Sequence, residues 1–173
     1  MRSFQRYDIL LRWWLFFAIA SLGTVALFVS GVIQKVSQVD FTKISFLIYA
    51  VFAVFTVRIG MDTYRLCRKE KYTDGLITAF YKKSEVGWFV SDILLTLGMI
   101  GTVAGFIYML SSSFAEMDPG NAISMQGVLV KLSTGMSTAL YTTAAGLVCS
   151  LLLKLQLFNF TNHLDFLSDE VKK

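Results

Sequence analysis

Four long apolar segments without a charged residue constrain this chain more than any other feature of its sequence. They cover about residues 13–34, 44–57, 93–115 and 132–153. A helix that crosses a bilayer needs about 20 mostly apolar residues. The shorter second run lies between Lys43 and Arg58, whose long side chains can reach the membrane surfaces. The runs predict an all-α polytopic membrane protein with four transmembrane helices.

The composition agrees with a membrane protein. Of the 173 residues, 55% are hydrophobic and 16% are charged, whereas soluble domains average about 25% charged residues. The formal net charge of +4 is typical of basic residues gathered on one side of a membrane, so it gives no reason to expect nucleic-acid binding. The two cysteines, Cys67 and Cys149, are too few for a disulfide framework, and we expect free thiols.

The basic residues are distributed unevenly between the loops. Of the 16 lysines and arginines, 13 lie before the first run, between the second and third, or after the fourth. The positive-inside rule therefore predicts that both termini and the stretch 60–87 are cytoplasmic. Helical spacing in this stretch indicates an extension of the flanking helices, with a partner-docking surface as the alternative. We thus expect an N-terminal helix pair with a short cytoplasmic helical segment over 1–87, a core over 88–160 and a cytoplasmic tail over 161–173.

Small and hydroxylated residues are concentrated in the third and fourth runs. In lipid, helices associate where small side chains let their backbones approach. The strings "LGMIGTVAGF" and "GMSTALYTTAAGL" place such residues three and four apart, on one face of each helix. We expect these faces to meet other protein, and the aromatic-rich first two runs to face lipid more. The candidates for helix packing are Gly98, Gly101, Gly105, Gly135, Ala139, Gly146 and Ser150.

Threonines accompany both stripes of small residues. Thr102 borders the first stripe, Thr143 belongs to the second, and Thr138 and Thr142 flank the second. They allow two interpretations, close helix packing or a lining that something polar touches. Spacing alone favours packing, as in any compact bundle. In sequence, a threonine that faces a cavity looks the same as one that bonds a backbone carbonyl, so both interpretations stay open.

No acidic residue lies within the four runs. Asp92 comes closest, and we expect it at a helix start, where the helix dipole favours an acid. An ion pathway normally uses an intramembrane carboxylate, so a partner would have to supply one. The single histidine, His163, lies in the tail away from any metal-ligand cluster. With no nucleophile–base arrangement or phosphate loop in the sequence, we expect no enzyme activity, no cofactor and no bound metal.

"LGMIGTVAGF", followed by an outward loop and "ALYTTAAGLVCSLLLKLQLFNF", resembles the paired-helix core of the MotA/TolQ/ExbB proton-channel family. The resemblance covers about Trp88 to Phe160. It implies a homo-pentameric ring in a bacterial inner membrane, around two copies of a single-span partner that carries an aspartate. It also implies that Thr102 and Thr143 line the ion pathway, with Thr138 and Thr142 as further candidates. The transported ion would be the proton, with sodium as the alternative.

One departure from the family concerns the string "GMSTAL". ExbB and TolQ have a glutamate where this chain has Thr138, and the four predicted spans suit a MotA-like or divergent member better. The middle stretch is much shorter than the torque-contacting domain of MotA. The resemblance therefore implies a stator subunit that converts ion flow into mechanical work in an envelope or defence machine. The alternative is a non-conducting scaffold packed through small residues; a four-span drug exporter is disfavoured, because the first run has no glutamate.

Overall fold

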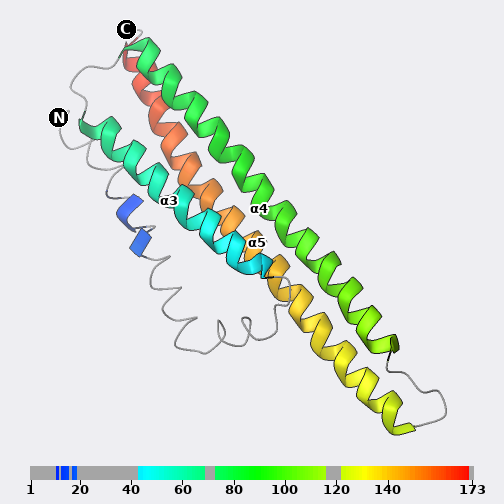
Figure 1. Ribbon diagram of the computed structural model, residues 1–173. Helices are drawn as coiled ribbons and strands as arrows, with labels where there is room; N and C mark the ends of the chain where they lie inside the picture. The colour runs from blue at the N-terminus through cyan, green and yellow to red at the C-terminus, as the bar shows by residue number, and fades with distance from the viewer. Residues whose placement is uncertain are drawn as a thin grey trace.

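The fold consists of long helices that run side by side. A computed structural model describes residues 11, 13–15, 17–18, 43–68, 73–115 and 122–171, and this part of the chain contains no strand. Its three long helices are α3 (Ile44–Arg68), α4 (Asp74–Ala115) and α5 (Ala122–Val171). Helices α4 and α5 form an antiparallel pair, and α3 lies beside one half of that pair (Figure 1).

The helix ends follow local sequence rules. Thr73 precedes α4, and its carbonyl accepts the backbone N–H groups of Leu76 and Ile77 at 2.9 and 3.1 Å, while Asp74 occupies the first turn, where the helix dipole favours an acid. Helix α3 ends on the basic residues Arg65 and Arg68. Cations stabilise a helix C-terminus for the same electrostatic reason.

Three helices are long and apolar enough to cross a membrane within the described residues: Ile44–Arg68, Asp74–Ser113 and Ala139–Asp169. The expectation of a helical membrane protein is therefore confirmed. The runs 44–57, 93–115 and 132–153 fall within α3, α4 and α5. Most of the run 13–34 lies outside the described residues.

The helices extend beyond the apolar runs. The stretch 60–87, which we expected to be helical, contains the end of α3 and the start of α4. The segment 161–171, which we treated as a tail, continues α5 without a break. Our expectation that Asp92 begins a helix was wrong, because α4 already begins at Asp74. The helix dipole acts within the first turn, so it does not stabilise Asp92.

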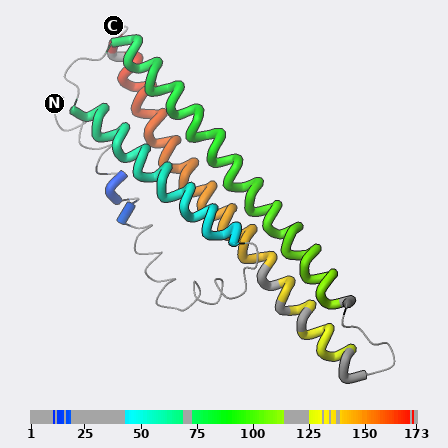
Figure 2. Tube along the Cα trace, in the orientation of Figure 1, coloured from blue at the N-terminus to red at the C-terminus, as the bar shows by residue number. Residues whose placement is uncertain are grey.

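Helix α3 packs beside the N-terminal half of α4 and the C-terminal half of α5, and runs parallel to α5 (Figure 2). Near its start, Ile48 is fully buried in a cluster with Leu94 and Leu153. Near its end, Leu66 belongs to a second cluster, which we call the end cluster. The end cluster consists of Leu66, Ile77, Phe80, Phe160, Leu164 and Leu167.

Polar contacts join the three helices around the end cluster. Lys83 of α4 donates a hydrogen bond of 3.1 Å to Asp62 of α3, whose side chain is only 11% exposed. The Tyr81 hydroxyl of α4 donates to the Asp165 carboxylate of α5. Charged side chains thus link all three helices beside the end cluster, whereas the apolar runs 44–57, 93–115 and 132–153 contain no charged residue.

The end cluster yields a prediction on stability. Leu164 is fully buried, whereas Phe166 on the same helix is 50% exposed. Because Leu164→Ala removes buried methyl groups and leaves a cavity, we expect it to lower the free energy of unfolding by about 2–5 kcal/mol. Thermal unfolding in detergent, followed by circular dichroism, measures the effect. Phe166→Ala is the control, and an equal loss of stability in both variants would contradict the assignment of this core.

Candidate functional site

Small residues bring the backbones of α4 and α5 close together. A Cβ atom on Gly146 would lie 2.8 Å from the Leu94 carbonyl oxygen and 2.9 Å from the Gly98 Cα atom. Further along, a Cβ on Gly101 would lie 3.0 Å from Thr142 Cβ, and one on Gly105 would lie 3.3 Å from Ala139 Cβ. Only glycine fits at Gly146, because backbone atoms cannot move aside as a flexible side chain can. We call this surface the small-residue contact; it consists of Gly98, Gly101, Gly105, Ala139, Thr142 and Gly146.

The two stripes meet each other within this single chain. We expected them to face other protein, but the surfaces are already occupied, with Ala139 1% exposed and Thr142 2% exposed. The stripes lie on adjacent antiparallel helices, so each is the nearest surface with a matching shape. Gly135 prolongs the contact against the Met109 side chain, and Ser150 is also buried, at 3% exposed.

Thr102 of α4 and Thr143 of α5 lie opposite each other across the pair. Their hydroxyl groups are in hydrogen-bond contact, and both residues are half-buried. Thr102 Oγ1 also lies 3.1 Å from the Gly98 carbonyl oxygen and 3.2 Å from that of Ala139. Thr143 Oγ1 lies 3.2 Å from the Gly98 carbonyl oxygen. The antiparallel helices thus place the two hydroxyls at one depth.

The threonine pair has fewer protons than acceptors. Each hydroxyl carries one proton and two lone pairs, and the pair faces two carbonyl oxygens as well as the two hydroxyl oxygens. One proton can bridge the hydroxyls while the other binds a carbonyl. Several such arrangements use the same oxygen positions, so the pair can exchange donor and acceptor roles without moving its backbone.

The other two threonines are placed differently. Thr142 is 2% exposed, lies against Gly101 and donates a 2.8 Å hydrogen bond to the Ala139 carbonyl. This position differs from the lining that we expected for Thr142, because the side chain turns into the contact with α4. Thr138 lies on α5, and its side chain is outside the described residues.

An ion pair marks one end of the site. Lys154 Nζ of α5 lies 2.8 Å from Asp92 Oδ1 of α4. Sequence reasoning noted both residues as limits of apolar runs but missed that they pair. The antiparallel arrangement could have suggested it, since these are the charged residues nearest to the same ends of the two runs. No acidic residue occurs in the sequence between Asp92 and Glu116, or between Asp118 and Asp165.

The fold and the site define a helical membrane protein with a central pair of long helices. Small residues pack these helices together, and two threonine hydroxyls face each other in a segment without acidic residues. Residues 79–171, more than half of the chain, match the model of the MotA/TolQ/ExbB proton channel family. The chain therefore belongs to the MotA/TolQ/ExbB proton channel family, as its resemblance predicted. The match encloses the range 88–160 in which we saw the resemblance and adds the parts of α4 and α5 around the end cluster. No curated protein and no solved structure gave a match to the chain.

The small-residue contact predicts opposite effects for one substitution at two positions of α5. Gly146→Ala places a methyl group against backbone atoms, whereas a Cβ on Gly127 meets nothing within 4 Å. We expect Gly146→Ala to lower the melting temperature in detergent, because α4 and α5 must move apart. Gly127→Ala should leave it unchanged or raise it, since alanine favours a helix over glycine by about 1 kcal/mol in water. Equal melting temperatures for the two variants would contradict the close approach.

Proposed function

We propose that this chain is the ring-forming channel subunit of an ion-driven motor in a bacterial inner membrane. Five copies would surround two copies of a single-span partner that carries an aspartate, and ion flow would be converted into mechanical work. The observation that carries the proposal is the facing pair of Thr102 and Thr143 hydroxyls in the acid-free part of α4 and α5. Membership in a proton channel family supports it.

The chemistry of the pair suits an ion pathway completed by a partner. A hydroxyl can donate to a carboxylate and accept from a carboxylic acid, so it can accompany both protonation states of a neighbouring aspartate. A buried carboxylate without such a partner would be costly in lipid. In this proposal the two threonines bind the partner aspartate or a water molecule, and the proton, or alternatively sodium, is the transported ion. Thr142 acts in helix packing.

The proposed membrane arrangement has four spans with both termini in the cytoplasm. The distribution of lysine and arginine supports it, and the charged contacts beside the end cluster suit the cytoplasmic side. The first span would lie over about residues 13–34, the run that is mostly outside the described residues.

A specific observation favours the second candidate, a non-conducting scaffold. The Thr102 and Thr143 hydroxyls lie within hydrogen-bond distance of backbone carbonyls of the same protomer. Interhelical hydrogen bonds of this kind stabilise helix pairs in membranes without any ion. The two candidate functions predict different ion flux when the threonine hydroxyls are removed but the side-chain shape is kept.

The proposed ring can be tested by measuring the mass of the purified assembly. Helices α4 and α5 expose apolar side chains such as Val103, Ile107 and Leu140, each at least 59% exposed, which would face lipid or neighbouring subunits. We expect native mass spectrometry of the purified full chain to show a homo-pentamer in two different detergents. Gly146→Leu, which forces α4 and α5 apart, should abolish it, and Gly127→Leu is the matched control. A stable monomer or dimer of the unmodified chain would argue against a ring.

Substitution of threonine by valine tests the ion pathway, because valine keeps the shape of threonine but lacks its hydroxyl. The complex is purified from native membranes through a tag on this chain and placed in vesicles, where proton and sodium flux are measured. We expect Thr102→Val with Thr143→Val to assemble normally but to lose flux at least tenfold. Serine at both positions should restore much of it.

The control is Thr142→Val, which changes a neighbouring threonine that donates to the Ala139 carbonyl. This variant should conduct like the unmodified chain. If the double valine variant conducts normally, the hydroxyls serve packing and the scaffold explains the structure better.

A further inference from the structure

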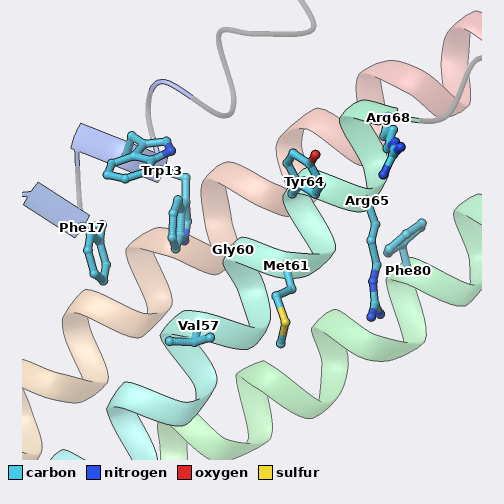
Figure 3. A pocket seen from close by; sticks show the side chains of 10 residues that line it. Trp13, Phe17, Val57, Gly60, Met61, Tyr64, Arg65, Arg68 and Phe80 are labelled. Atoms are coloured by element: carbon cyan, nitrogen blue, oxygen red, sulfur yellow. The ribbon is translucent and has the colours of Figure 1, made fainter.

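A groove of about 970 Å³ opens along α3, where side chains of the N-terminal residues, of α3 and of α4 meet (Figure 3). Aromatic and aliphatic side chains line most of it. Ligand sites in proteins typically measure about 300–1,000 Å³, so the groove is large enough for a substantial part of a lipid or drug-sized molecule. Its lining consists of Trp13, Trp14, Phe17, Val57, Gly60, Met61, Tyr64, Arg65, Arg68 and Phe80.

The apolar floor of the groove is well defined. The Trp13 and Phe17 rings stack with centroids 5.4 Å apart, and Trp13 lies directly on Gly60, where a Cβ atom would come within 2.2 Å of the ring. The Trp13 indole nitrogen is buried and has no hydrogen-bond acceptor among the described residues.

The charge at the rim is positive. Arg65 and Arg68 line the groove, and the Arg65 side chain is 64% exposed. Asp62 lies 3.8 Å from Arg65 but is also bound by Lys83 at 3.1 Å, so its one carboxylate is shared by two cations. Among these described residues, Arg65, Arg68 and Lys83 outnumber Asp62, which gives the rim an excess of positive charge. Such a rim attracts an anion, and arginine is suited to phosphate because its fork of donors matches two phosphate oxygens.

The groove lies where a membrane surface is expected. Trp13 begins the first apolar run of the sequence, and Val57 ends the second. Both residues line this one groove, so the start of the first run and the end of the second lie at the same height along α3. The headgroup layer extends about 5–7 Å beyond the hydrocarbon core. Arg65 lies two turns beyond Val57, and its guanidinium group turns back toward Asp62 and the membrane. Tryptophan is enriched at the same boundary.

We propose that this groove binds an anionic phospholipid, with an acyl chain against Trp13, Gly60 and Met61 and its phosphate on Arg65 and Arg68. The apolar floor matches the chain, the basic rim matches the headgroup, and the order of the two along α3 matches the order of the layers in a bilayer. The proposal depends on the position of the groove at the membrane surface and not on ion conduction.

Quenching of tryptophan fluorescence tests the proposal. Trp88→Phe in the full chain leaves Trp13 and Trp14 as the only tryptophans. The protein is placed in phosphatidylcholine vesicles that contain a small fraction of phosphatidylglycerol with brominated acyl chains, or the same fraction of brominated phosphatidylcholine. We expect the brominated phosphatidylglycerol to quench more strongly. Arg65→Gln with Arg68→Gln should lower its apparent affinity by roughly fivefold for each arginine, while lysine at both positions should retain most of the preference.

Arg58→Gln is the matched control. It removes the same charge from α3, but Arg58 lies over the Phe55 ring and outside the groove, so the preference for phosphatidylglycerol should remain. Met61→Phe narrows the groove without changing charge and should also reduce quenching. Equal quenching by the two brominated lipids, or an equal effect of Arg58→Gln and the double glutamine variant, would overturn the proposal. Relief of quenching by excess inorganic phosphate would also overturn it, because the site would then bind a free anion.

Discussion

The backbone contact between Gly98 and Gly146 is the constraint on which the rest of the structure depends. At this point a Cβ atom on either helix would come within about 3 Å of the backbone of the other. In lipid the hydrophobic effect does not hold two helices together, so close packing and hydrogen bonds must do so. The contact fixes the register of α4 against α5. That register in turn brings Thr102 opposite Thr143 and Asp92 opposite Lys154.

The same two helices change their means of association along their length. Around Gly98 they are joined by small residues and hydroxyls, whereas around Leu66 and Leu164 they share an apolar cluster with α3. Charged groups differ between the two regions, because the runs 93–115 and 132–153 contain none, whereas Lys83 bonds Asp62 and Tyr81 bonds Asp165 beside the end cluster. The helix pair therefore passes from an uncharged part to a part with charged links. The Asp92–Lys154 pair lies between these parts, whereas the groove with Arg65 and Arg68 reaches the end cluster at Phe80.

The threonine pair has properties that suit both a channel and a scaffold. Thr102 and Thr143 stabilise the helix pair through carbonyl oxygens of Gly98 and Ala139, and their half-buried hydroxyls remain able to bind a further polar group. A device that conducts ions by means of a partner needs both properties, since it must be rigid when the partner is absent and polar when the partner is present. Membership in a proton channel family favours the channel.

The sequence by itself determined the helical membrane character, the three apolar runs that lie in α3, α4 and α5, and the family. These properties depend on hydropathy and on the spacing of small residues, which are local in the chain. Tertiary structure alone decided that the two glycine stripes face each other, that Thr142 turns inward, and that Asp92 lies within a helix and binds Lys154. A stripe at helical spacing shows which residues share a face but not which surface covers that face. The covering surface follows from the rotation and register of two helices, and these are set by contacts between residues far apart in the sequence.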